Sequence, residues 1–251
     1  MPHPDPTAFT LFGLDVQWYG ICIGLGFLLA ILLSYRRAPR LQIEPDFIID
    51  FAIWLIPLSI VGARAYYVLF NWDRYGKDLA SILDVRGGGL AIHGGLIVGV
   101  LVAFALCRKR QVSFRNLADL IFPQVALAQA IGRWGNFFNG EAHGGPTDLP
   151  WAIEVDGQLV HPTFLYESLW CLFLFAFLVW LTKRRSFQGQ IGLLYGMLYS
   201  LERGLVEQLR TDSLMIGPFK QAQVLSGCVF LLCLAAYVLL QQRQHKESKV
   251  K

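Results

Sequence analysis

The stretch VQWYGICIGLGFLLAILLSY, residues 16–35, decides the class of fold. It carries no charged side chain, and its length matches the roughly 20 residues that a helix needs to cross a bilayer. Peptide groups in hydrocarbon must pair within the protein, and a helix pairs all of them inside one segment. The stretch therefore predicts a transmembrane helix.

The composition of the whole chain agrees with this interpretation. Of the 251 residues, 55% are hydrophobic and only 16% are charged, whereas a soluble domain carries about 25% charged residues. The apolar residues fall in blocks of membrane-crossing length, which predict seven helices: 16–35, 47–70, 89–107, 117–138, 163–182, 191–209 and 221–241. We expect an all-α polytopic membrane protein, with a single integral membrane domain over residues 1–251 and small extracytoplasmic loop elements.

The basic residues predict an orientation. Alternate connections and the C-terminal tail hold 14 of the 22 Lys and Arg: Arg36, Arg37, Arg40, Arg108, Lys109, Arg110, Arg115, Lys183, Arg184, Arg185, Arg243, Lys246, Lys249 and Lys251. Loops rich in Lys and Arg stay in the cytoplasm, so the N-terminus should lie outside and the C-terminus in the cytoplasm. The segment 1–9 is rich in Pro and has no basic residue, so we expect the first span to be retained rather than cleaved as a signal peptide.

Several kinds of site find no support in the sequence. The five cysteines lie in or beside apolar segments, without the spacing of metal ligands, and are expected to be small buried residues. There is no His or Asp pattern for a metal, no Gly-rich nucleotide loop, and no serine with an arranged base. We therefore expect no metal, no cofactor and no nucleic-acid partner.

Three arginines fall inside predicted spans, namely Arg64, Arg133 and Arg203. A cation in the membrane core is costly unless it is paired or hydrated, so such residues are functional hypotheses by default. The alternative is that they reach the interface or tie helices together. This alternative stays open for all three, and most of all for Arg64.

The string YSLERGLVEQLR, residues 199–210, has the clearest geometry. Its polar residues follow helical spacing and should project from one face of a helix as a ladder of charge: Tyr199, Arg203, Glu207 and Arg210. A purely structural ladder is the alternative, but burying so many polar groups for packing alone costs much desolvation.

A second polar string, IGRWGNFFNGE at residues 131–141, closes the fourth apolar block. Helical spacing places Arg133, Asn136 and Asn139 along one edge before Gly140 lets the chain turn outward. With the predicted orientation, these groups and the ladder lie toward the outer half of the membrane.

Two further residues have competing interpretations. His93 stands between glycine pairs in GGGLAIHGGLIVG, where it is either a satisfied core residue or a general base beside a close-packed site. Tyr19, next to Trp18, is either an ordinary interfacial aromatic or part of the same site.

The arginines favour an anionic ligand that arrives through the lipid, hence an anionic phospholipid. Arg binds phosphate in bidentate fashion and keeps its charge when desolvated. His93 could activate an incoming nucleophile. The chain shows no good nucleophile of its own, so direct transfer to a second substrate is expected.

Six strings together resemble the bacterial prolipoprotein diacylglyceryl transferase family. They occur in the family's order, cover the length of the chain, and include a highly specific Gly-Arg-x-Gly-Asn motif: WYG at 18–20, HGGL at 93–96, GRWGNFFNGE at 132–141, GGPT at 144–147, HPTFLYE at 161–167 and YSLERGLVEQLR at 199–210. The resemblance implies a seven-helix inner-membrane enzyme that moves the sn-1,2-diacylglyceryl group of phosphatidylglycerol to the lipobox cysteine thiol of a prolipoprotein signal peptide. A thioether would form and glycerol-1-phosphate would leave, as the first step of lipoprotein maturation.

The resemblance also implies roles for individual residues. Arg133 and Arg203 match the arginines expected to bind the lipid phosphate and headgroup, and His93 matches the proposed base. The remaining matches are substrate-binding residues of the signature or polar groups that line the site: Tyr19, Asn136, Asn139, Glu141, Gly144, Tyr199, Glu207 and Arg210.

A transporter or flippase for an anionic solute is the alternative from another class. Against it, the polar groups gather toward one side, no inverted repeat is visible, and seven spans do not divide into halves. A purely structural membrane scaffold would leave the charge ladder unexplained. Transfer onto a peptide cysteine by purified protein in detergent would separate the classes, because it needs no gradient and no sealed vesicle.

Overall fold

The computed structural model describes residues 5–76, 78–84 and 88–250, with side chains up to Glu247. The first four residues of the predicted N-terminal segment lie outside the described residues, as do Lys77, Arg86 and Lys251 and the side chain of Lys249. The chain divides into two compact units, residues 1–34 with 118–251 and residues 35–117, and each is described by itself.

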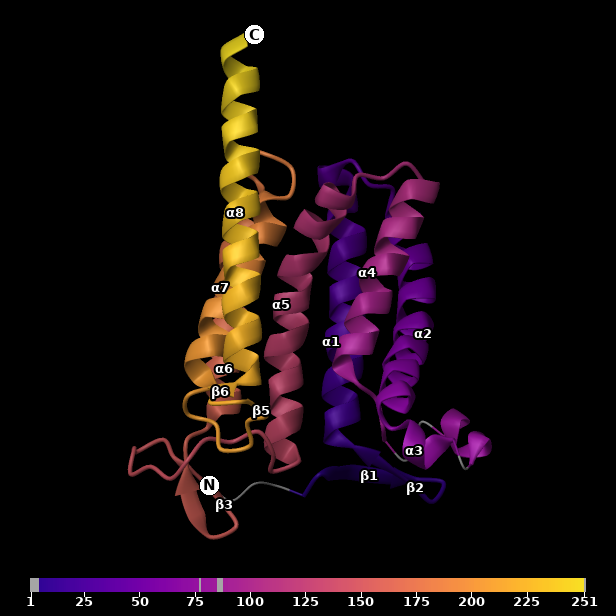
Figure 1. The fold of residues 1–251 in the computed structure, drawn as a ribbon, viewed down its shortest axis with the longest axis vertical. Coiled ribbons are helices and arrows are strands. Elements are labelled where there is room, and N and C mark those ends of the chain that lie inside the picture. Colours follow the sequence, from indigo (N-terminus) through magenta and orange to yellow (C-terminus); the bar gives the residue numbers. More distant parts are fainter. Residues whose placement is uncertain (1–4, 77, 85–87, 251) are drawn as a thin grey trace. The chain divides into compact units, whose positions relative to one another are not determined.

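Seven long helices account for the predicted apolar blocks (Figure 1). They are α1 (Trp18–Arg37), α2 (Pro45–Phe70), α4 (Ile92–Lys109), α5 (Phe114–Phe138), α6 (Thr163–Thr182), α7 (Gln190–Val206) and α8 (Gln221–Val250). Most bounds lie within three residues of the prediction. The C-terminal helix is longer, because the polar sequence after 241 continues the helix that the apolar block begins, while the sixth block ends as a helix at Val206 rather than at 209.

Short elements join the long helices. They are the hairpins β1 (Thr7–Leu11) with β2 (Leu14–Gln17), β3 (Ile153–Val155) with β4 (Gln158–Val160) and β5 (Met215–Ile216) with β6 (Phe219–Lys220), the helix α3 (Trp72–Tyr75), and the 3-10 turns η1 (Ala38–Leu41) and η2 (Leu79–Leu83). The hairpins form where residues with positive φ, such as Gly157, turn the chain.

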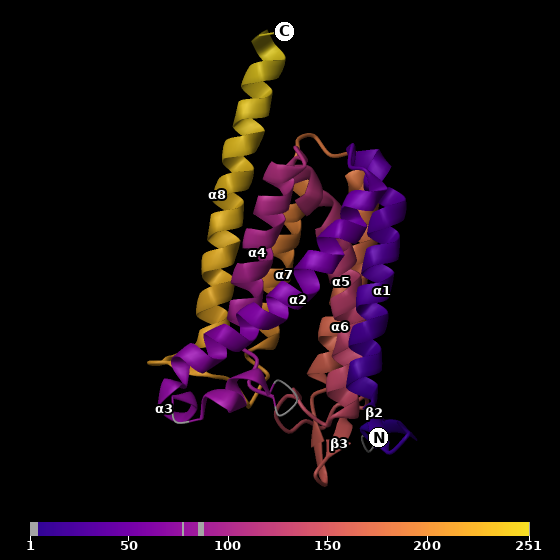
Figure 2. The same ribbon diagram turned by 90° about the vertical axis from the view of Figure 1, so that its right-hand side faces the viewer.

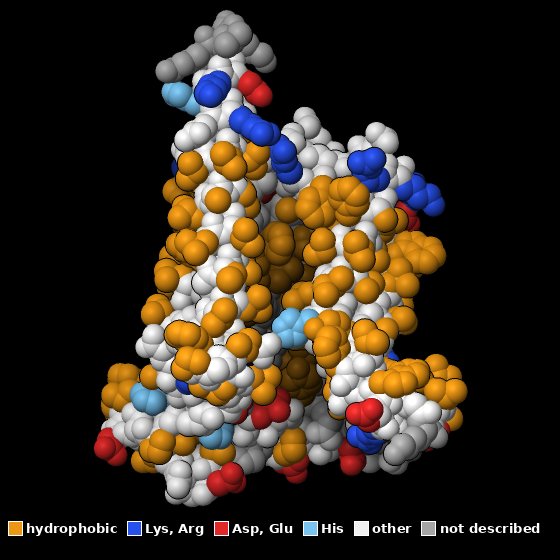
Figure 3. Space-filling model, in the orientation of Figure 1, with side chains coloured by type: hydrophobic (Ala, Val, Ile, Leu, Met, Phe, Trp, Pro, Cys, Tyr) orange, Lys and Arg blue, Asp and Glu red, His pale blue; other side chains and the backbone are white. Residues whose placement is uncertain are grey.

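Five of the long helices are long and apolar enough to cross a membrane by length and composition, namely α1, α2, α4, α6 and α8. Figure 3 shows hydrophobic side chains along the outer face of α8, as expected of a helix in contact with lipid. The helices α5 and α7 carry more polar residues, and α7 has 17 residues. The architecture is that of an all-α membrane protein, while the count of seven spans stays a prediction.

In the unit 35–117, α2 and α4 lie side by side, as Figure 2 also shows. Glycines allow their close approach: a Cβ on Gly94 would overlap the carbonyl group of Gly62. At the start of α2, Phe47 and Ile48 are buried, as is Leu41 just before it, and the Asn116 amide donates a hydrogen bond to the Leu41 carbonyl at 3.0 Å.

In the unit that contains residues 118–251, α7 packs between α6 and α8 (Figure 1). A buried hydrophobic cluster ties α5, α6 and α7 together, made by Ala126, Leu174, Leu178, Ile191 and Tyr195. Since α6 runs antiparallel to its neighbours α5 and α7 in this unit, the end of α5, the start of α6 and the end of α7 share one end of the unit.

The opposite end is fastened by a buried carboxylate. Asp119 of α5 is fully buried and accepts hydrogen bonds from the backbone N–H groups of Gly189 at 2.7 Å and Gly192 at 3.0 Å. Arg185 adds an ion pair at 2.6 Å. Asp119 of α5 thus caps the N-terminus of α7, where the dipole of that helix favours a negative charge.

Replacing Asp119 by Asn should therefore destabilise the protein. The amide cannot accept all three bonds as a carboxylate does, so we expect the free energy of unfolding to fall by about 1–3 kcal/mol. Thermal unfolding of the purified protein in detergent would measure this. The matched control is Asp50→Asn, which removes an exposed ion pair with Arg110 and should change little. Equal unfolding temperatures for the two variants would contradict the capping role.

Candidate functional site

Three of the predicted arginines and two glutamates meet at one end of the unit that contains residues 118–251. Arg133 stands near the end of α5, Glu167 near the start of α6, and Arg203 near the end of α7. Because these three ends coincide, the side chains form one cluster, completed by Glu207 and Arg210 from the chain after α7. We call these five residues the Glu167 cluster.

Glu167 is the centre of this cluster. Its side chain is 1% exposed and contacts all three guanidinium groups. Oε2 pairs with Arg133, while Oε1 lies 3.6 Å from Nη1 of Arg203 and 3.7 Å from Nη1 of Arg210. One carboxylate therefore fixes the positions of three cations from separate segments.

Glu207 supplies the second shared carboxylate. It is buried, lies 2.7 Å from Nη2 of Arg203 through Oε2, and reaches Nε of Arg210 at 4.0 Å. The predicted pairing of Arg203 with Glu207 one helical turn apart is present.

The predicted helical ladder is wrong at Arg210. The helix α7 ends at Val206, Glu207 is its C-cap, and Arg210 lies in an extended bridge with Gly144. Lys220 explains the end of the helix, because its Nζ donates to the carbonyl oxygens of Glu207 at 2.7 Å and Arg210 at 2.8 Å. A cation at a helix C-terminus satisfies unpaired carbonyl groups and the dipole. Arg210 still reaches Glu167, but through the turn and not through helical spacing.

Arg210 is also held from the rim of the cluster by Asp212. Its Nε and Nη2 donate to the two carboxylate oxygens of Asp212 at 2.9 and 2.6 Å. This bidentate hydrogen bond, more than the nearby positive charge alone, lowers the pKa of the half-exposed Asp212. Arg210 is thus pre-oriented by carboxylates on both sides.

The amides of the second polar string turn to a different partner. Asn136 and Asn139 both donate to Oε1 of Glu141, at 3.0 and 3.2 Å, and Glu141 is exposed. Asn139 lies one residue beyond the end of α5 and not on the helix. Arg133 therefore enters the cluster, while Asn136, Asn139 and Glu141 form a separate polar group at the turn out of α5.

Gly144 matters because two backbone segments approach it. A Cβ there would lie 2.7 Å from Cβ of His161 and 3.0 Å from the Leu209 carbonyl oxygen. The N–H groups of Gly144 and Gly145 donate to the carbonyls of His161 and Leu209, each at 2.9 Å. The absence of a side chain lets the loop 140–162 be fastened beside Arg210.

The two predicted tyrosines belong to the same unit. Tyr19 is 39% exposed and packs against Gly135, where a Cβ would lie 2.7 Å from its ring. Tyr199 is half-buried and stacks on Tyr195 with ring centroids 5.5 Å apart. Arg133 and Arg203 both act electrostatically on the Tyr199 hydroxyl, which places Tyr199 beside the cluster.

His93 belongs to the other unit, residues 35–117. It is half-buried at the start of α4, with its ring 6.2 Å from that of Tyr66. Arg64, in the same unit, is a structural residue: it is buried and donates to the carbonyls of Ser81, Ile82, Gly88 and Gly89 at 2.7–2.9 Å. It fastens the loop that leads into α4.

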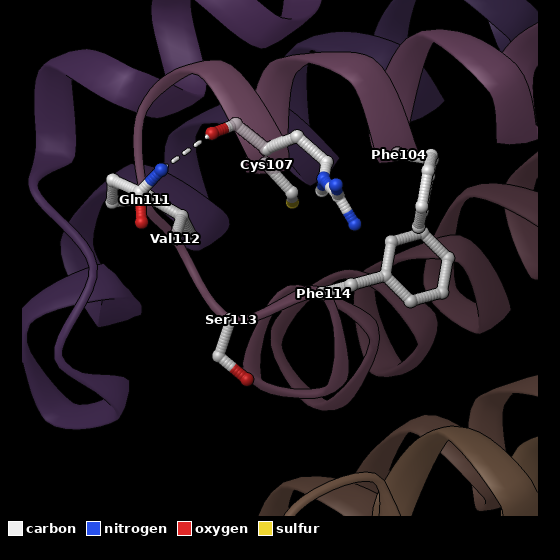
Figure 4. A pocket seen from close by; sticks show the side chains of 7 residues that line it. Phe104, Cys107, Gln111, Val112, Ser113 and Phe114 are labelled. Atoms are coloured by element: carbon white, nitrogen blue, oxygen red, sulfur yellow. Dashed lines mark hydrogen bonds between the residues drawn. The ribbon is translucent and has the colours of Figure 1, made fainter.

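A pocket of about 550 Å³ lies at the turn between α4 and α5 in the unit 35–117 (Figure 4). Phe104, Cys107 and Phe114 give it apolar walls, and the Gln111 amide donates to the Arg108 carbonyl at 3.0 Å beside it. None of the predicted site residues lines this pocket. Within the described part of the chain, no group of three His, Cys, Asp or Glu could hold a metal ion.

Two buried carboxylates were missing from the predicted site, Glu167 and Glu202. Both are at most 5% exposed, in α6 and α7. Glu167 lies in the string HPTFLYE, and three membrane-embedded arginines require carboxylate partners, so a charge inventory could have identified it. Glu202 offered no such signal beyond its place next to Arg203.

Replacing Glu167 by Gln should destabilise the protein strongly. It leaves three partly buried guanidinium groups without the buried carboxylate that they share, and breaking a buried ion pair costs about 3–5 kcal/mol. Thermal unfolding in detergent should show a large drop. Asp212→Asn, at the half-exposed rim, should cost within about 1 kcal/mol. A Glu167→Gln protein as stable as the wild type would refute the central role.

Known proteins resemble this chain over nearly its whole length. The sequence profile of the family described as prolipoprotein diacylglyceryl transferase matches residues 6–239. A phosphatidylglycerol–prolipoprotein diacylglyceryl transferase of Finegoldia magna is 48% identical over 244 residues, which cover 97% of each chain. Proteins of the same name from Clostridioides difficile and Acaryochloris marina are 47% and 44% identical, over 95% and 89% of this chain and 96% and 86% of theirs. The chain therefore belongs to the prolipoprotein diacylglyceryl transferase family.

Proposed function

We propose that the Glu167 cluster is the site at which this enzyme binds the phosphate of phosphatidylglycerol. As a member of its family, the chain is a transferase that moves a diacylglyceryl group from phosphatidylglycerol to prolipoproteins, the first step of lipoprotein maturation. The observation that carries the proposal is the convergence of three guanidinium groups on one buried carboxylate at one end of the helices. Guanidinium groups match the geometry of phosphate oxygens.

We further propose that all seven long helices span the bacterial inner membrane. The N-terminus would then lie outside and the C-terminus in the cytoplasm. The basic turn Lys183–Arg185 supports this orientation, because it lies at the Asp119 end of its unit, opposite the Glu167 cluster. The cluster then opens on the extracytoplasmic side, where a secreted prolipoprotein presents its signal peptide.

The proposed reaction transfers the group directly. The thiolate of the lipobox cysteine attacks the carbon of the diacylglyceryl group that bears the phosphate. A C–S bond forms there, and the bond between this carbon and the phosphate oxygen breaks. The products are a thioether and glycerol-1-phosphate, and the thiol proton passes to a base. A free thiol has a pKa of about 8.5, which nearby cations lower. The arginines would therefore assist both the attacking sulfur and the leaving phosphate.

The carboxylates give the arginines fixed directions before the lipid arrives. Arg203 lies between Glu167 and Glu207, and Arg210 between Glu207 and Asp212. Donors that are already oriented need little reorganisation when charge develops on the leaving phosphate, which is the main source of electrostatic catalysis. Arg133 and Arg203 are the arginines proposed to act on the reacting phosphate.

Other predicted residues remain proposals for substrate binding. Tyr19 and Tyr199 would border the lipid, while Asn136, Asn139 and Glu141 would form a polar rim where α5 ends. Gly144 acts by allowing its loop to pack beside Arg210. His93 is the proposed base for the thiol. Its ring is half-buried and not enclosed, which supports that role.

Replacing Arg203 by Ala should abolish transfer. Loss of one guanidinium at the reacting phosphate should lower the rate by about 100-fold or more. Purified variants in detergent, incubated with phosphatidylglycerol and a lipobox peptide, would be compared by the mass shift of the peptide cysteine. The control Arg110→Ala removes an exposed arginine of an ion pair and should keep wild-type transfer. Near-normal transfer by Arg203→Ala would remove Arg203 from the mechanism.

The same assay tests His93. The substitution His93→Gln keeps a hydrogen-bonding side chain but cannot carry the proton away, so an obligatory base predicts a loss of about 100-fold or more. The loss should shrink as pH rises, since the thiol then ionises without help. Substantial residual transfer at neutral pH would show instead that His93 only positions another group.

A further inference from the structure

Glu202 is a buried carboxyl that the proposed mechanism does not use. It lies in α7 directly before Arg203 and is 5% exposed. Within the described part of the chain, neither of its side-chain oxygens has a hydrogen-bond partner. A buried carboxylate normally has partners, because burying unpaired charge is costly. This departure calls for a function.

The charges that act on Glu202 come from several elements. Arg133 of α5, Glu167 of α6 and Arg203 of its own helix are near enough to act on it electrostatically, without forming an ion pair, and Cys171 of α6 lies within the same range. The neighbouring helix α8 has no charged residue between Gln221 and Gln242. Glu202 therefore belongs to the electrostatic surroundings of the Glu167 cluster, although it forms none of its ion pairs.

With Glu202 included, the buried charges balance before any ligand binds. Three partly buried arginines, Arg133, Arg203 and Arg210, face three buried glutamates, Glu167, Glu202 and Glu207. At the rim, Asp212 and Lys220 add one charge of each sign, so the balance is kept. A phosphodiester brings one more negative charge into this buried region. An uncompensated charge there is costly, so either the anion binds poorly or one carboxylate takes up a proton.

Glu202 is the carboxylate that can be neutralised with least loss. Glu167 contacts three arginines and Glu207 contacts two, so a proton on either would weaken several ion pairs. A proton on Glu202 breaks no hydrogen bond and no ion pair among the described residues. It would instead give Glu202 a donor that the anion could use.

We infer that Glu202 takes up one proton when the Glu167 cluster binds a phosphodiester anion, so that lipid and proton bind together. The proton comes from the aqueous phase, forms an O–H bond on Glu202, and returns to water when the anionic product leaves. The inference rests on the proposed function of the cluster. It makes lipid affinity fall as pH rises, because proton uptake is then less favourable.

Calorimetry can count this proton. Dioctanoyl phosphatidylglycerol would be titrated into the purified full chain in non-ionic detergent, in pairs of buffers with different heats of ionisation, across roughly pH 5 to 9, where a buried carboxyl can titrate. The wild type should take up close to one proton toward the alkaline side, with affinity falling by up to about tenfold per pH unit. Dioctanoyl phosphatidylcholine, which has no net charge, should bring no proton.

The isosteric variant Glu202→Gln mimics the protonated state. It should bind phosphatidylglycerol without proton uptake and with little dependence on pH, whereas Glu154→Gln, an exposed acid in β3, should behave as wild type. Proton uptake that persists in Glu202→Gln would assign the proton to another group, such as a histidine, and overturn the inference. If the wild-type protein binds phosphatidylglycerol without proton uptake at any pH, this result alone overturns the inference.

A third variant separates this inference from the proposed function. If the cluster binds the lipid phosphate, Arg203→Ala should lose most of the affinity for phosphatidylglycerol. Undiminished binding by Arg203→Ala would refute the proposed site itself. Binding that depends on Arg203 but takes up no proton would leave the proposed site standing and refute only the role of Glu202.

Discussion

The contact of Glu167 with three guanidinium groups is the constraint on which this end of the helices α5, α6 and α7 depends. A buried arginine is stable only with a partner, and here one carboxylate serves Arg133, Arg203 and Arg210. The three cations come from α5, α7 and the turn after α7, so their shared partner holds these segments in register. The capping of that turn by Lys220 and the close packing of the loop at Gly144 both keep Arg210 within reach of Glu167.

Together with Glu202, the Glu167 cluster is electrically balanced, and this changes how it can bind an anion. A site with excess positive charge attracts any anion, whereas a balanced site favours one that offers better geometry to donors already in place. The arginines are directed by Glu167, Glu207 and Asp212, so their free N–H groups have fixed positions. Selectivity for a lipid headgroup would then come from the directions of the arginine N–H groups. The protonation state of Glu202 would set the free-energy cost of the added negative charge.

The sequence predicted an all-α membrane protein because apolar blocks and helical pairing in hydrocarbon leave few alternatives. It also predicted Arg133, Arg203 and Glu207 as neighbours. It failed where tertiary contacts override local pattern. Helical spacing could not show that α7 ends at Val206, because Lys220 caps it from the second strand of the next hairpin. The partner of the arginines, Glu167, was overlooked because its role arises only when α6 meets α5 and α7.

The string at residues 131–141 contributes side chains to two separate polar groups. Its residues looked like a single polar edge, yet only Arg133 enters the Glu167 cluster. Asn136 and Asn139 instead bind the exposed Glu141 at the turn, and Gly135 admits the ring of Tyr19. A guanidinium in the buried cluster and an amide pair at its rim differ in charge and in exposure. In the proposed function, the lipid phosphate binds the guanidinium, and the amide pair at the rim is left for the second substrate. On that proposal, the motif would contact both substrates of the transferase.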